Sequence, residues 1–150
     1  MQLQRCIREA DLLSQELRSF LAAEDIEYLR VWALHHGMPS YQRWYDDHRT
    51  EIWKFLERSP AWRKECLLKL PAEDRRLTIM SALNVVGLGR LLCSALRREC
   101  GGMDGKSPRK ALTSACIAYE GVVESDPWYW PFDPPNPLRA AEFRFCPPSS

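Results

Sequence analysis

Apolar residues recur along most of this chain at steps of three and four, and this period restricts the fold to helices. No stretch of useful length alternates apolar and polar residues as a half-buried strand would, and no internal repeat is present. In the first predicted helix one face collects the apolar residues Leu3, Cys6, Ile7, Ala10, Leu13, Leu17, Phe20 and Leu21. Leu12 lies on the opposite face, so we expect it to be exposed. The pattern predicts an all-α protein.

Capping residues divide the chain into about six predicted helices. Ser59-Pro60 and Ser107-Pro108 each place an N-cap residue before a proline at the first helical position. Ser40 is predicted to cap a further helix, and Gly37 to end one with a positive φ angle. The predicted helices span residues 3–21, 23–36, 41–58, 60–70, 71–100 and 108–125.

The predicted helix over residues 71–100 is apolar on nearly all sides between Leu77 and Leu88, so we expect it to lie at the centre. Gly87 and Gly89 allow a neighbouring helix to approach closely. They are also candidates for a break into two helices, because each glycine costs roughly 1 kcal/mol relative to alanine. The run Val86–Gly89 lacks the third glycine and the preceding strand of a dinucleotide-binding loop, which favours helix packing. The inner face of the helix over 41–58 is predicted to hold Tyr41, Trp44, Tyr45, His48, Ile52, Phe55 and Leu56.

The segment Asp126–Pro137 departs from this pattern, with five prolines and four aromatic side chains in twelve residues. Proline lacks an N–H and fixes φ, so the segment cannot continue a helix. Burying four such rings is worth on the order of 6–12 kcal/mol gross. The segment therefore either closes the core between the helices over 71–100 and 108–125 or is offered to a partner. We expect a helical domain over 1–125 and an extended segment over 126–150, within one structural unit. The candidate protein-binding residues are Trp128, Tyr129, Trp130 and Phe132.

A basic cluster is the second candidate site. Arg97 and Arg98 close one predicted helix, and Arg109 and Lys110 open the next across a short loop, so the four should lie together. Such a cluster can neutralise phosphates. No helix-turn-helix, zinc-finger or RNA-binding signature accompanies it, and cations at a helix C-terminus also stabilise the helix dipole.

The three histidines show no convincing metal spacing. His35 and His36 are adjacent and point about 100° apart on a helix, so they do not chelate one ion together. His48 and Glu51 form the one histidine–carboxylate pair at helical spacing, and no CxxC motif is present. A cross-helix site of His36, His48 and Glu51 stays open as an enzymatic alternative. No cysteine or serine is singled out as a nucleophile with an adjacent base.

Composition favours a reduced, cytoplasmic protein. The six cysteines are even in number, but a chain of 150 residues with this apolar content does not need disulfides. Residues 1–10 contain Arg5, Arg8 and Glu9 and no apolar signal core. The most apolar stretch, Leu77–Leu88, is shorter than the ~20 residues of a membrane span. Arginine outnumbers lysine severalfold, which is compatible with a GC-rich bacterial, plasmid or phage genome.

These observations predict a non-enzymatic regulator, adaptor or inhibitor that binds another protein and carries no cofactor and no metal. A chain from a plasmid or phage would act on a host or competitor protein. The rival prediction is a nucleic-acid-binding regulator that uses the basic cluster. A homodimer through exposed aromatic residues is a further alternative.

Overall fold

The computed structural model describes residues 2–100, with side chains described for residues 4–90 except 6, 38 and 88. Within this range the chain is helical, without strands, so the all-α prediction is confirmed there. The predicted helix over 108–125 and the aromatic–proline segment lie outside the described residues. The helices are α1 (Gln2–Arg18), α2 (Ala23–Glu57), α3 (Pro60–Lys69) and α4 (Ala72–Cys100).

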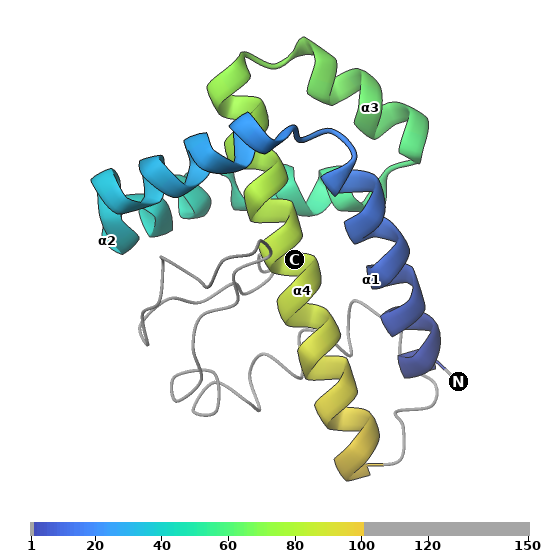
Figure 1. The fold of residues 1–150 in the computed structure, drawn as a ribbon. Helices are drawn as coiled ribbons and strands as arrows, with labels where there is room; N and C mark the ends of the chain where they lie inside the picture. Colours follow the sequence, from blue (N-terminus) through green and yellow to red (C-terminus); the bar gives the residue numbers. More distant parts are fainter. Residues whose placement is uncertain (1, 101–150) are drawn as a thin grey trace.

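α4 is the central helix, as its apolar pattern predicts. It packs against both α1 and α2, and Figure 1 shows it running through the middle of the helices. It is continuous through Gly87 and Gly89, so the expected candidate break does not occur. Both glycines are buried, which fits close packing of a neighbouring helix. The buried apolar side chains of α4 are Leu77, Ile79, Met80, Ala82, Leu83, Val85 and Val86.

α2 consists of two helices joined by a kink at Gly37. This residue has φ 77° and ψ 173°, a backbone region that is essentially restricted to glycine. Figure 1 shows α2 turning back on itself, with its first half in front of α4 and its second half behind. The positive φ predicted for Gly37 is confirmed, and the kink lets one segment hold α4 from two sides.

The predicted cap at Ser40 is wrong. Ser40 lies inside the second half of α2, where backbone angles are already helical, and Gly37 is the non-helical residue of the kink. Pro39 lies in the first turn after the kink, where its missing N–H breaks no helical hydrogen bond and its fixed φ suits a helix. The second half of α2 therefore starts directly after Gly37 and includes Pro39 in its first turn.

α3 begins as its sequence predicts and is fixed to α1 by an ion pair. The Ser59 hydroxyl accepts a hydrogen bond from the Trp62 N–H at 3.2 Å, with Pro60 at the first helical position. Arg63 is buried and donates two hydrogen bonds of 2.6 Å to the Glu16 carboxylate. Arg63 also donates to the Arg58 carbonyl. The amphipathic pattern did not reveal this buried arginine.

The N-terminal half of α2 contacts the start of α4 through polar groups. Arg76 donates to Asp25 at 2.7 Å, and its guanidinium lies 4.4 Å from the centre of the Tyr28 ring. Trp32 Nε1 donates to Glu73 at 3.2 Å. Burial raises the pKa of Asp25, but hydrogen bonds from the Ala22 N–H and from Arg76 outweigh burial and hold it below its ordinary value.

Acidification is expected to weaken the contact between Asp25 and Arg76. Because the folded pKa of Asp25 is depressed, its contribution to stability is present above about pH 4 and is lost as the pH falls through the folded pKa. The difference in free energy of unfolding between the wild type and Asp25→Asn should therefore shrink on acidification. Urea denaturation of both proteins over this pH range measures it. A difference in the free energy of unfolding that stays constant with pH would contradict the depressed pKa of Asp25.

Candidate functional site

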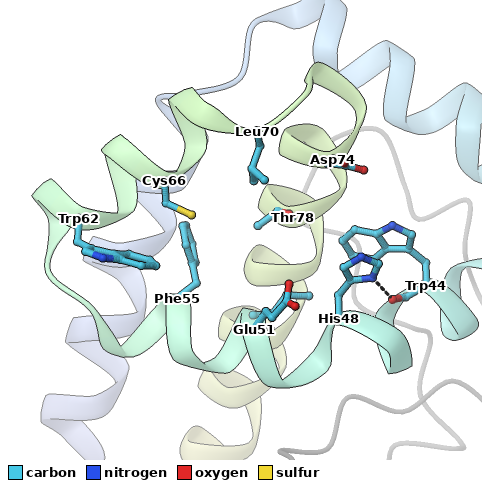
Figure 2. Close-up of a pocket in the computed structure, with 10 residues that line it drawn as sticks. Trp44, His48, Glu51, Phe55, Trp62, Cys66, Leu70, Asp74 and Thr78 are labelled. Carbon is cyan, nitrogen blue, oxygen red and sulfur yellow. Dashed lines mark hydrogen bonds between the residues drawn. The ribbon is translucent and has the colours of Figure 1, made fainter.

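A pocket of about 360 Å³ opens between the second half of α2, α3 and the first turns of α4 (Figure 2). This volume lies near the lower end of the roughly 300–1,000 Å³ typical of ligand pockets. Its walls are mostly apolar, with polar groups contributed by each wall. The lining residues are Trp44, His48, Glu51, Ile52, Phe55, Trp62, Cys66, Leu70, Asp74 and Thr78. We call it the α2–α3–α4 pocket.

The positions of these residues follow from helical spacing and from the short connections between helices. Trp44, His48 and Phe55 project from one side of α2, because residues four apart lie on the same face of a helix. Trp62 and Cys66 project from α3 in the same way. α3 starts three residues after α2 ends, and Figure 2 shows it lying across from the second half of α2 with the pocket residues between them.

One end of the pocket is formed by a stacked pair of rings. Trp44 and His48 lie 4.1 Å apart between ring centres, with planes inclined by 16°. His48 Nδ1 lies 2.8 Å from the Trp44 carbonyl oxygen; this oxygen can only accept, so Nδ1 carries the proton. Trp32 and His36 repeat the arrangement in the first half of α2, at 4.3 Å and 16°. Stacking and the hydrogen bond together fix the orientation of the His48 ring.

The other end holds Trp62, Phe55 and Cys66. The Trp62 and Phe55 rings meet edge to face at 6.4 Å, and the Arg58 guanidinium lies 5.1 Å from the centre of the Trp62 ring. Trp62 is 40% exposed, whereas most of the other aromatic side chains that the structure describes are buried. This end of the pocket presents a fixed aromatic surface to solvent.

The charges on the pocket walls are acidic. Glu51 on α2 and Asp74 on α4 both line it and are exposed. Among the described lining residues there is no lysine or arginine. The negative charge of the two carboxylates is therefore not balanced by a basic lining residue.

Cys66 and His48 both line the pocket. Figure 2 shows Cys66 beside Trp62 and Phe55, at the end away from His48, so the two do not form a nucleophile–base pair. Among the residues whose side chains are described, no group of three histidine, cysteine or carboxylate side chains could hold a metal ion. His48 and Glu51 share the pocket, whereas His36 stacks on Trp32 outside it. The proposed cross-helix site of these three residues is not assembled.

A smaller pocket of about 160 Å³ lies between α1, α2 and α4. Its walls are apolar apart from Glu9 and Arg90. Arg90 donates to Asp11 at 2.6 Å, which joins the rim of this pocket to α1. The pocket is small and offers few polar groups to orient a ligand, so the α2–α3–α4 pocket is the stronger candidate.

The structure does not test the sites predicted from the sequence. Trp128, Tyr129, Trp130 and Phe132 lie outside the described residues, as do Arg109 and Lys110. Arg97 and Arg98 fall in the last turns of α4, but their side chains are not described.

Sequence reasoning noted the spacing of His48 and Glu51 but missed the pocket that they line. The signal that could have found it is the repeat of large or polar residues every four positions through Trp62, Cys66, Leu70, Asp74 and Thr78. These positions continue across the connection between α3 and α4, and all of them face the same space.

Comparison of the chain with protein-family models, curated proteins and solved structures gave no match. None of the helices within residues 2–100 combines the length and the apolar character needed to cross a membrane.

Proposed function

We propose that this chain is a protein-binding regulator, adaptor or inhibitor without chemistry of its own, and that the α2–α3–α4 pocket belongs to its binding surface. The observation that carries the proposal is an open, largely apolar pocket with a 40% exposed tryptophan at one end. Exposed apolar patches with such anchors mark interaction surfaces.

The rigidity of the aromatic end supports the proposal. Contacts with Phe55 and Arg58 limit the rotation of the Trp62 ring before any partner arrives. A side chain that is already held loses less conformational entropy on binding, so more of its burial energy appears as affinity. Tryptophan is also the residue type most enriched at interface hot spots.

The aromatic–proline segment stays a second predicted binding surface. It is tested in the full-length chain by the double substitution Trp128→Ala and Trp130→Ala. A partner that uses both surfaces would lose affinity with either set of substitutions. A partner that uses only the pocket would respond to Trp62→Ala alone.

The nucleic-acid alternative rests on Arg97, Arg98, Arg109 and Lys110 and gains no support from the described surface. Glu51 and Asp74 would repel phosphates at the pocket. Salt separates the two functions, because nucleic-acid binding weakens steeply between about 50 and 200 mM salt, whereas an aromatic interface responds little. If charge reversal at Arg97 and Arg98 abolished activity while the tryptophan substitutions left it intact, the protein-binding proposal would be wrong.

The test of the pocket compares Trp62→Ala with Leu12→Ala. Both side chains are exposed apolar residues, but Leu12 lies on α1 and does not line the pocket. A partner captured by the wild type and then purified should bind Trp62→Ala at least about 30-fold more weakly, as expected for a hot spot of 2 kcal/mol or more. Leu12→Ala should bind like the wild type. Circular dichroism checks that both variants fold, and equal binding by all three proteins would rule out the pocket.

A further inference from the structure

We propose that the α2–α3–α4 pocket binds a partner protein segment that carries an arginine or lysine next to a large apolar residue. This inference rests on the proposed function and names the chemistry of the partner. The cation is attracted to Glu51 and Asp74 on opposite walls, and the apolar side chain packs against Trp62 and Phe55.

The first argument is that the two carboxylates have no cationic partner within the part of the chain that the structure describes. Neither Glu51 nor Asp74 takes part in any ion pair with a residue whose side chain the structure describes. Three basic residues of α3 and α4 pair with other carboxylates: Arg63 with Glu16, Lys69 with Glu65, and Arg76 with Asp25. A cation brought by a partner therefore meets unpaired negative charge.

The second argument is that aromatic rings stand at both ends of the acidic region. Trp44 lines one end and Trp62 the other, and the face of a tryptophan ring attracts an ammonium or guanidinium group. Because the Arg58 guanidinium already lies 5.1 Å from the centre of the Trp62 ring, Trp62 is assigned to the partner's apolar side chain and Trp44 to its cation. Arginine satisfies both features at once, because its planar group pairs with carboxylates and stacks on rings.

The third argument excludes the chain's own aromatic–proline segment as the preferred occupant. Residues 126–137 contain Asp126 and Asp133 and no basic residue. Placing this segment in the pocket would add two carboxylates next to Glu51 and Asp74, and like charges at an interface disfavour the wrong partner. Charge complementarity instead favours a basic segment from another protein.

The experiment measures binding of fluorescently labelled peptides to the full-length protein by anisotropy. The basic probe is a short synthetic peptide in which leucine and arginine alternate; its matched control has glutamate in place of every arginine. A third probe is the peptide of residues 126–137. The basic peptide should bind measurably at about 0.15 M salt, and the other two should bind at least about tenfold more weakly.

Two charge-matched double variants locate the site. Glu51→Gln with Asp74→Asn should weaken binding of the basic peptide about tenfold. Glu24→Gln with Asp47→Asn removes the same charge from exposed residues outside the pocket and should change it by less than about twofold. Trp62→Ala should weaken it at least about tenfold. Circular dichroism confirms that each variant is folded.

Equal weakening by the two double variants would mean general charge attraction and would overturn the proposal. Tighter binding of the 126–137 peptide, or no binding of the basic peptide, would overturn it as well. The proposed function fails separately: if capture of a protein partner still depends on Trp62 while the basic peptide does not bind, the pocket is an interface and only the basic partner is wrong.

Discussion

Replacing Glu16 with alanine is expected to lower the free energy of unfolding by about 3 kcal/mol. Glu16 accepts two hydrogen bonds of 2.6 Å from Arg63, whose side chain is only 8% exposed. Removing the carboxylate leaves a buried guanidinium whose charge is uncompensated, and breaking such a pair costs roughly 3–5 kcal/mol. The lower end applies because Glu16 itself is 24% exposed, so water can partly replace it. Urea denaturation followed by circular dichroism measures the change.

The matched control is Glu9→Ala on the same helix. Glu9 pairs with Arg5 at 3.0 Å, but the two side chains are 55% and 78% exposed. Exposed pairs at this spacing contribute about 0.3–0.5 kcal/mol, so this substitution should have little effect. The double variant Glu16→Leu with Arg63→Met should recover much of the loss, because it replaces both charges with apolar groups. Equal losses in Glu16→Ala and Glu9→Ala would show that burial of Arg63 contributes nothing.

Local signals explain what could be predicted about the fold. Ser59-Pro60 specifies a helix start through a hydroxyl and a fixed φ angle, and both act within four residues. Gly37 interrupts α2 because its backbone angles suit glycine alone. The first helix ends at Arg18, three residues before the predicted Leu21, since the end of a helix depends on where the chain must turn.

Long-range contacts explain what could not be predicted. Trp53 falls outside the predicted inner face of its helix, yet it is 6% exposed and donates to the Tyr45 hydroxyl at 2.9 Å. The second half of α2 is covered on more than one side, so it buries more than one stripe of residues. Arg63 reads as a surface residue until α1 brings Glu16 to it, 47 positions away. The burial of Trp53 and the pairing of Arg63 with Glu16 both depend on how separate helices pack, which the local apolar pattern does not specify.

The candidate site falls between these two cases. The helical spacing of His48 and Glu51 is visible in the sequence, and the structure places both in the α2–α3–α4 pocket. The pocket itself depends on how α3 folds back over α2 and how Asp74 and Thr78 of α4 complete the walls. A site formed by three helices needs their packing angles, which apolar periodicity does not specify.

A buried hydrogen-bond network fixes the second half of α2, which carries one wall of the pocket, against α4. The Tyr41 hydroxyl lies 3.0 Å from Ser81 Oγ and accepts a hydrogen bond from Asn84 Nδ2 at 2.9 Å. All three residues are completely buried. Burial raises the pKa of Tyr41 despite opposing hydrogen bonds from Ser81 and Asn84, so the hydroxyl keeps its proton. The network therefore sets the register of α2 on α4 beside the pocket.

Tyr41→Phe is expected to lower the free energy of unfolding by about 2–3 kcal/mol. The substitution keeps the ring but leaves the Ser81 hydroxyl and the Asn84 amide without their shared partner, and each buried unsatisfied group costs about 1–3 kcal/mol. Asn84 Oδ1 already has no hydrogen-bond partner within the described residues. Tyr28→Phe is the control, because no hydrogen bond to its hydroxyl is found among those residues. Urea denaturation of both variants gives the comparison.

The triple variant Tyr41→Phe, Ser81→Ala and Asn84→Leu tests whether Tyr41→Phe destabilises the protein through unsatisfied hydrogen-bonding groups or through altered core packing. If the cost of Tyr41→Phe comes from unsatisfied polar groups, removing those groups as well should restore most of the stability, because an apolar core has nothing left unpaired. If the cost comes from altered packing around the ring, the triple variant should be less stable than Tyr41→Phe, since leucine and asparagine differ in shape. α2 forms one wall of the pocket, so binding at the pocket in the triple variant shows whether the hydrogen bonds are needed to hold α2 in one position. A core without directed hydrogen bonds can regain stability while its helices are held less uniquely, and binding at the pocket would then weaken although the protein remains folded.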